Sequence, residues 1–158
     1  MTPIDICNKA LAHLGEPPIR GIDPSGTLPQ RLCYRWYHPT RRELLCSEQY
    51  SFSDRKVVLI NHGRGFRVPD DCIRVRGLRD VEMDGRTITA CSGGEVSPDG
   101  KLMVLRYTAD VENPDEFSDE FVRRFALRLA LRMCMTLTES PSIEDDIREK
   151  LNEKEMAV

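Results

Sequence analysis

The sequence lacks the patterns that mark metalloproteins, secreted disulfide scaffolds and membrane proteins. Its six cysteines lie far apart and form no C-x-x-C pair, which argues against a zinc site. No uninterrupted apolar run approaches the length of a membrane span, and the opening MTPIDICNKALAHLG has no apolar signal-peptide core. We therefore expect buried, reduced thiols in a protein made in a reducing cytosol, without a membrane anchor.

Motifs for catalysis are also missing. The histidines are scattered and are not spaced like a metal-ligand pair: His13, His38 and His62. Gly63 and Gly65 lack the lysine and helix pattern of a phosphate loop, and no serine-nucleophile signature occurs. The acidic pairs at 70–71 and 145–146 are typical of solvated turns and helix faces rather than cation sites. The sequence therefore predicts no enzyme activity, no cofactor and no bound metal.

Composition indicates a globular domain with an uneven charge. The chain has 158 residues, of which 40% are hydrophobic and 31% charged, enough for one domain with a core. Its net charge of −3 argues against a dedicated nucleic-acid clamp. From Glu139 onward there are seven acidic and three basic residues, so this segment carries −4 and the rest of the chain +1.

The first 48 residues show helical periodicity. The pattern predicts a helix over 3–14 that ends at Gly15. A second helix is expected over 28–46, with a kink or break near His38, because Pro39 cannot donate a backbone hydrogen bond.

Residues 56–108 change period and predict a β insertion. Short β-branched or alternating runs are separated by turn residues, which is typical of a small antiparallel sheet of about four to six strands. The expected strands are 57–60, 66–68, 72–78, 81–83, 86–90 and 102–108. Asp84 and Gly85 form a tight-hairpin signal, because this pair accepts positive φ angles.

Helical periodicity returns after the predicted sheet. A central helix is expected over 117–138 with Ser118 as its cap, followed by an acidic helix over 142–156. The last helix has a narrow apolar line of Ile143, Ile147 and Leu151, and acidic residues on the opposite side: Asp145, Glu149 and Glu153. The order predicts an α+β fold, mainly a helical bundle with an inserted small antiparallel β-sheet, in a single domain of residues 1–158.

The segment FVRRFALRLALRMCMTLT, residues 121–138, is strongly apolar but carries several arginines. Three of them recur at i, i+4 and i+8 and form the arginine stripe: Arg124, Arg128 and Arg132. Arg123 stands apart in the first turn. Apolar residues cover most of the remaining circumference, so this helix is either the centre of the bundle or part of a subunit contact. The stripe either pairs with the acidic last helix, through residues such as Asp145 and Glu149, or faces a neighbouring subunit or a DNA channel.

Four blocks of the sequence, taken in order, resemble one protein family. The blocks are ICNKALAHLGEPPI, RLCYRWYHPTRRELLCSEQYSFS, FRVPDDCIRVRGL and LRYTADVENPDEFSDEFVRRFALRLALRMCMTLTES. They look like the sequence pattern of tail tubular protein A, the head-to-tail adaptor (connector, or head-completion) family of short-tailed bacteriophages. The matching blocks cover most of residues 4–140. The aromatic corner departs from the family, which usually has Trp before Phe where this chain reads QYSF, residues 49–52.

This resemblance implies a non-enzymatic protein of the virion neck or tail, synthesised and assembled in the host cytoplasm. Members of the family form a homo-oligomeric ring, typically twelvefold, between the portal protein and the tail nozzle protein. Viral DNA passes through the channel without sequence specificity during ejection. On this reading, the candidate residues for a subunit or portal interface, or for the channel wall, are Arg124, Arg128, Arg132, Ile143, Ile147 and Leu151.

Two other functions stay open. A virion-associated cell-wall (peptidoglycan) hydrolase would need a pair of carboxylates, for which Glu43, Glu95 and Glu112 are candidates. A DNA-binding regulator would use the arginine-bearing helix, although the negative net charge and the absence of helix-turn-helix spacing weaken this hypothesis.

Overall fold

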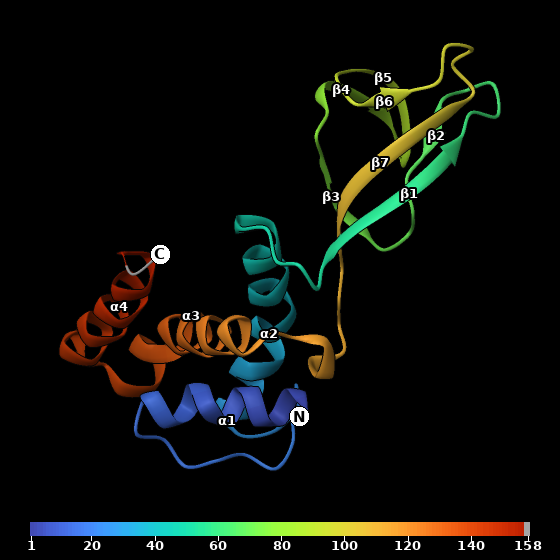
Figure 1. The fold of residues 1–158 in the computed structure, drawn as a ribbon. Helices are drawn as coiled ribbons and strands as arrows, with labels where there is room; N and C mark the ends of the chain where they lie inside the picture. Colours follow the sequence, from blue (N-terminus) through green and yellow to red (C-terminus); the bar gives the residue numbers. More distant parts are fainter. Residues whose placement is uncertain (157–158) are drawn as a thin grey trace. The chain divides into compact units, whose positions relative to one another are not determined.

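The computed structural model describes residues 1–156, with side chains through Asn152, and has an α+β fold as predicted. Helices α1 and α2 precede two small antiparallel sheets, and helices α3 and α4 follow them (Figure 1). The chain divides into two compact units. The helical unit comprises residues 1–44 and the chain from Asn113 onward, and the β unit comprises residues 45–112.

Helix α1 (Pro3–His13) forms because its first turn satisfies its own backbone donors. The Thr2 side chain accepts a hydrogen bond from the Asp5 N–H, and the Asp5 carboxylate accepts one from the Thr2 N–H, which completes a capping box. Gly15, with φ +70°, follows the C-cap residue Leu14 and turns the chain away. The predicted start is confirmed, and the end lies within one residue of the prediction.

Helix α2 (Leu28–Ser47) is one continuous helix with Pro39 inside it. Of the expected kink or break near His38, the break is therefore wrong and the kink stays a prediction. An internal proline costs about 3 kcal/mol through the lost hydrogen bond and a clash with the preceding turn. Buried side chains on both sides of Pro39 offset this cost, since Cys33, Tyr37 and Leu44 all lie in the core. Burial therefore outweighs the local preference of the chain.

Helix α3 (Asp119–Thr138) follows a short 3₁₀ turn, Pro114–Glu116, and is capped by Ser118 as predicted. The Ser118 hydroxyl accepts a hydrogen bond from the Phe121 N–H at 3.2 Å. Glu139 ends the helix in the left-handed conformation, with φ +51°. Helix α4 (Pro141–Met156) begins immediately afterwards, so Pro141 starts this helix instead of stopping the one before.

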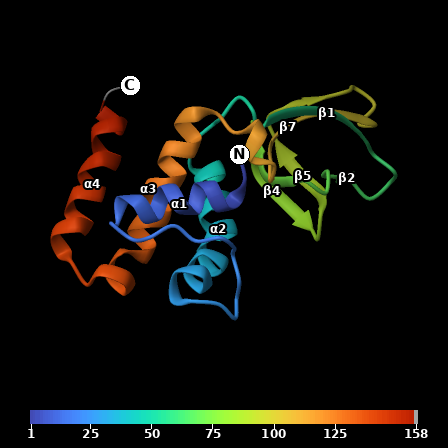
Figure 2. The same ribbon diagram turned by 90° about the horizontal axis from the view of Figure 1, so that it is seen from below.

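Helix α3 is the centre of the helical unit. It packs against both α1 and α4, and Figure 2 shows α1 crossing it. Its buried aromatic residues form a cluster with a tyrosine of α2: Phe117 from the preceding turn, Phe121, Phe125 and Tyr37. Packing within the helical unit explains why apolar residues cover most of the circumference of α3. A subunit contact is not needed to explain it.

The β unit contains two sheets rather than the single sheet expected. The first has the order β1–β7–β3 with β6 paired to β7, from strands Asp54–Ile60 (β1), Leu102–Ala109 (β7), Cys72–Arg76 (β3) and Glu95–Val96 (β6). The second has the order β2–β5–β4, from Phe66–Arg67, Thr87–Ser92 and Arg79–Asp84. All six predicted strands are present. The two-residue β6 was missed because it is too short to show a period.

The hairpin predicted at Asp84 and Gly85 joins β4 to β5. Asp84 pairs with Thr87, which leaves Gly85 and Arg86 as the loop, and Gly85 has φ +59°. The tight turn therefore uses glycine at its first central position.

The six cysteines are free thiols, as expected, and four of them are buried. A hydrogen bond from the Cys7 thiol to Cys33, together with burial, raises the pKa of Cys7, which disfavours its reactive thiolate. We expect Ellman's reagent to modify only the half-buried Cys46 and Cys91 in the native protein, and all six thiols after denaturation. Stopped-flow absorbance would measure this, and rapid native modification of Cys7 would contradict its burial.

Candidate interaction surfaces

The arginine stripe of α3 lies largely inside the helical unit. Arg124 is only 6% exposed, and its guanidinium lies 3.4 Å from the carboxylate of Glu120, one turn earlier in the same helix. Arg132 pairs with Glu43 of α2, and its guanidinium also lies 4.9 Å from the centre of the Trp36 ring. The α3 stripe therefore meets carboxylates of α2 and of α3 itself.

This arrangement corrects one expectation. Arg124 and Arg132 pair with Glu120 and Glu43, not with Asp145 or Glu149 of the last helix. The physical reason is that Arg132 points toward α2, where a carboxylate and an indole ring are both available. Glu153, expected on the same acidic side of α4, lies outside the described side chains.

The remaining predicted site residues also lie close to the core. Arg128 is half-buried, and its Nε atom is buried without a hydrogen-bond partner. Of the apolar line on α4, Ile147 is buried, while Ile143 and Leu151 are half-buried, and α4 packs on α3. These side chains therefore contribute to packing within the helical unit. Their role at a subunit interface stays a prediction.

The carboxylates considered for wall hydrolysis belong to three different segments of the chain. Glu43 is on α2 and is already engaged by Arg132, Glu95 is on β6, and Glu112 follows β7. Across the part of the chain that the structure describes, no three His, Cys, Asp or Glu side chains lie close enough to hold a metal ion.

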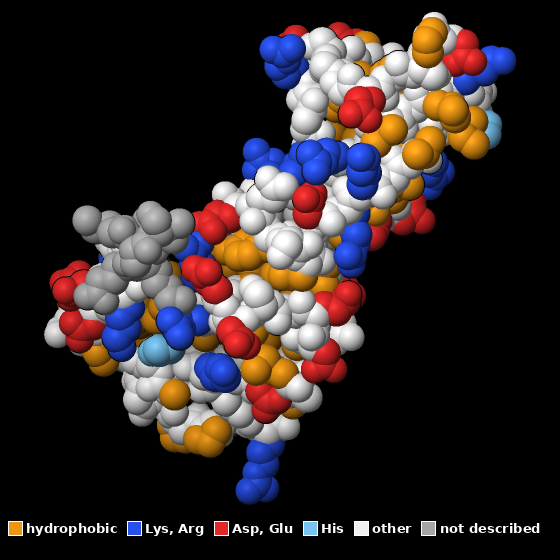
Figure 3. Space-filling view, in the orientation of Figure 1, with side chains coloured by type: hydrophobic (Ala, Val, Ile, Leu, Met, Phe, Trp, Pro, Cys, Tyr) orange, Lys and Arg blue, Asp and Glu red, His pale blue; other side chains and the backbone are white. Residues whose placement is uncertain are grey.

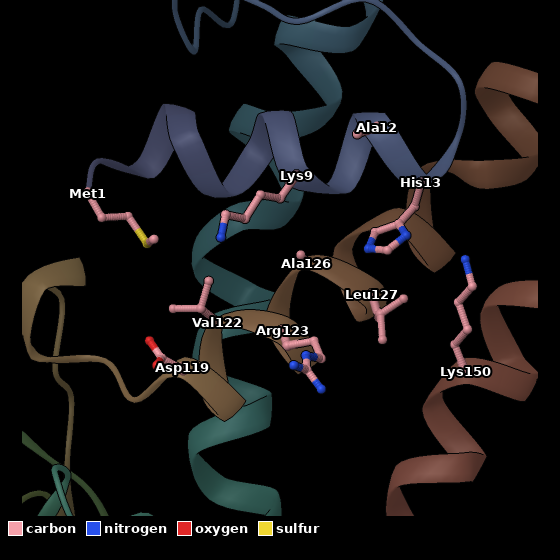
Figure 4. A pocket seen from close by; sticks show the side chains of 10 residues that line it. All are labelled: Met1, Lys9, Ala12, His13, Asp119, Val122, Arg123, Ala126, Leu127 and Lys150. Carbon is pink, nitrogen blue, oxygen red and sulfur yellow. The ribbon is translucent and has the colours of Figure 1, made fainter.

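A basic groove runs between α1 and α4 in the helical unit, with α3 at its floor (Figure 4). Its volume is about 840 Å³. Three apolar residues of α3 form the floor, namely Val122, Ala126 and Leu127, and basic side chains come from all three helices, namely Lys9, His13, Arg123 and Lys150. We call this surface the basic groove.

Three cations of the basic groove lack an ion pair among the described residues. Among the described residues, Lys9, Arg123 and Lys150 have no hydrogen bond or ion pair, and Asp119 is the acidic residue that lines the groove. The α-amino group of Met1, at one end, is paired with Asp115 at 3.2 Å. The groove therefore presents an excess of positive charge above an apolar floor.

The pKa of His13 is affected by this positive charge. Burial, followed by the positive charge of Lys150, lowers the pKa of His13 from its ordinary value of 6.5. Both effects disfavour the imidazolium form, so His13 is predominantly neutral at pH 7.

The lowered pKa predicts a pH dependence of stability. The unfolded state binds the His13 proton more readily, so this contribution is complete above pH 6.5 and is lost as the pH falls through the folded pKa. One such proton gives a slope of at most about 1.4 kcal/mol per pH unit. Urea unfolding of the wild type and of His13→Gln between pH 7.5 and pH 5 would measure the difference. A wild type no steeper than the variant would contradict it.

Sequence reasoning singled out Arg123 only as the arginine outside the stripe and gave no weight to Lys9 or Lys150. The spacing of Lys9 and His13, at i and i+4, placed these two side chains on one helix face. Nothing in the sequence showed that this face lies opposite Arg123 and Lys150, because α1 is far along the chain from α3 and α4.

The β unit has a second surface, on the exposed face of the first sheet. Lys56, Arg106 and Arg76 are direct neighbours across β1, β7 and β3. Like charges placed directly opposite one another destabilise a sheet. Arg76 is held by hydrogen bonds from its guanidinium to the Thr108 hydroxyl at 2.6 Å and to the Glu48 carbonyl at 3.2 Å. Repulsion among the three cations of this row therefore destabilises the sheet, while two hydrogen bonds hold Arg76 in its place.

Exposed apolar side chains lie beyond this row. Figure 3 shows them gathered over the end of β1 and the start of β7, where the exposed residues are Val58, Ile60, Val96 and Leu102. Val58 pairs with Val104, and Ile60 pairs with Leu102, so the patch crosses both strands. Contiguous exposed apolar side chains of this kind often mark an interaction surface.

No family model matches this chain, and no curated protein shows significant similarity to it. Within the described residues, no helix is both long enough and apolar enough to cross a membrane.

Proposed function

We propose that this chain is a structural, non-enzymatic subunit of a head-to-tail adaptor ring in a short-tailed bacteriophage. In this role the ring is homo-oligomeric, twelvefold as in the family that the sequence resembles, and joins the portal protein to the tail nozzle protein. Viral DNA passes through its channel without sequence-specific contacts.

The observation that carries this proposal is the position of the resembling blocks in the fold. ICNKALAHLGEPPI covers most of α1 and its closing turn, and FRVPDDCIRVRGL runs from β2 through β3. The last block runs from β7 through the 3₁₀ turn into α3. Each of these three blocks thus coincides with an element boundary or a core element.

The surfaces described above also suit an adaptor. A ring subunit must offer different, complementary surfaces to its two neighbours and further surfaces to the partners above and below. This chain has a basic groove in the helical unit, and a cationic row with an apolar patch in the β unit. In contrast, Arg124 and Arg132 of the α3 stripe are paired within the helical unit and Arg128 is half-buried, which leaves the stripe little surface for reading DNA.

The proposal is tested by assembly with the portal protein of the same phage. The purified chain and the portal should form a complex whose native mass and electron micrographs show a ring of this chain at one end of the portal. A chain that stays monomeric at every concentration, with and without portal, would exclude an adaptor role. Clearing of purified cell wall in a zymogram, lost on substitution of Glu43, Glu95 or Glu112, would instead support the hydrolase.

A further inference from the structure

We propose that the basic groove of the helical unit receives the acidic face of α4 from a second copy of this chain. The inference specifies a subunit contact for the proposed ring, and therefore rests on that proposed function. It follows from two sets of side chains that have opposite charge and that lack hydrogen bonds and ion pairs among the described residues.

The first set lines the groove. Lys9 extends from α1, Arg123 from α3 and Lys150 from α4 toward the same hollow (Figure 4). None of the three has a hydrogen bond or ion pair among the described residues, although α3 and α4 both contain paired arginines. Holding three like charges around one hollow opposes folding by mutual repulsion. An acidic occupant would remove this repulsion.

The second set lies on α4. Asp145, Asp146 and Glu149 are exposed, and none of them has a hydrogen bond or ion pair among the described residues. Their neighbour Glu144 differs, because its carboxylate lies 2.9 Å from the Arg148 guanidinium. Asp145 and Glu149 are one turn apart, so they form one acidic face of the helix.

Asp145 and Glu149 lie on a different side of α4 from Lys150, which allows one copy to use both its groove and its acidic face. Lys150 belongs to the groove, whereas Glu149, one residue earlier, is turned away from it by about 100°. A copy can therefore place its acidic face in one neighbour while its own groove receives another. Such a heterologous contact repeats until it closes a ring or grows into a filament.

The floor of the groove fits a helix as the occupant. Val122, Ala126 and Leu127 are apolar, and Ala12 and Ala126 are small enough for close helix approach. Helix α4 would then lie as an amphipathic helix in an apolar groove with charged walls, a common mode of helix recognition. Duplex DNA could also meet the cations, and the experiment below separates this alternative.

A charge-swap experiment tests the contact. The groove variant carries Lys9→Glu and Arg123→Glu, and the α4 variant carries Asp145→Lys and Glu149→Lys. A matched control carries Arg64→Glu and Lys101→Glu, which change two exposed cations of the β unit by the same net charge. Molar mass would be measured by light scattering over a range of concentrations, with and without portal, and circular dichroism would verify folding.

Each variant alone should associate at least about tenfold more weakly than the wild type, because like charges then face each other at the contact. The control should associate normally. An equimolar mixture of the groove and α4 variants should recover association, because each reversed surface then meets a complementary one. Normal assembly of both variants would overturn the inference while leaving an adaptor ring intact.

A zero-length cross-link on the wild type provides a test that needs no substitution. Equal amounts of ¹⁴N- and ¹⁵N-labelled protein are treated with a carbodiimide, which joins an amine to a carboxylate in direct contact. Mixed-isotope peptides joining Lys9 or Lys150 to the 145–149 segment would support the contact. Assembled protein without such peptides would overturn it.

Two further outcomes separate the inference from the proposed function. Mixed-isotope cross-links in a protein that never binds portal would support the groove contact and exclude the adaptor role. Salt-dependent binding of a labelled DNA duplex that is lost in the groove variant, with self-association unchanged, would assign the groove to DNA and overturn the inference.

Discussion

Replacing Phe125 by alanine is expected to lower the free energy of unfolding of the helical unit by about 3–5 kcal/mol. The side chain is fully buried at the centre of the aromatic cluster. Its ring centre lies 4.9 Å from that of Tyr37, 5.7 Å from Phe121 and 6.3 Å from Phe117. Truncation removes the contacts of one ring with three others and leaves a cavity that surrounding helices fill only in part.

A control on the same helix isolates the effect of burial. Met135→Ala removes a large side chain that is 45% exposed, and this change should cost less than about 0.5 kcal/mol. Urea unfolding gives both values, and amide hydrogen exchange should show lost protection in α1 and α3 for the Phe125 variant. Similar costs for the two variants would show that the cluster is not the core of this unit.

Replacing Gly65 by alanine is expected to destabilise the β unit by about 2–5 kcal/mol. Gly65 has φ +124°, which costs a residue with a side chain roughly 1–2 kcal/mol. A Cβ atom would also lie 2.2 Å from the carbonyl oxygen of Ile88, in the neighbouring strand β5. Relieving this overlap requires a backbone shift at the pairing of β2 with β5, at a further cost of about 1–3 kcal/mol.

The neighbouring Gly63 provides the matched control. It also has a positive φ, +101°, but a Cβ atom there would meet nothing within 4 Å. Gly63→Ala should therefore cost only about 1–2 kcal/mol, the backbone part of the effect. Urea unfolding, with amide exchange of β5 as a local readout, measures the difference. If the two variants were equally stable, the close approach of Gly65 to β5 would be refuted.

Arginines that already have a carboxylate partner within the helical unit are poor targets for testing assembly. Two of the three arginines of the stripe, Arg124 and Arg132, are paired within the helical unit, whereas Arg123, beside the stripe, is exposed in the basic groove. An arginine with an internal carboxylate gains little from an external one. The unneutralised side chains of the groove are therefore the more informative targets for charge reversal.

The sequence by itself determined the features that depend on neighbouring residues. The caps at Thr2 and Ser118 were readable because a hydroxyl and the backbone it satisfies lie within three residues of each other. The turn at Gly85 was readable because its backbone conformation favours glycine. The succession of helices and strands followed from local periodicity, and with it the α+β class.

Only the tertiary structure decided the features that depend on residues far apart in the chain. Helix α2 continues through Pro39 because core contacts on both sides outweigh a local penalty. The strands form two sheets because pairing is selected by side-chain packing between strands rather than within them. The basic groove exists because packing on α3 brings Lys9 and Lys150 to the same side as Arg123. Local energies select each element, whereas the placement of charges on the folded surface follows from burial of the apolar faces.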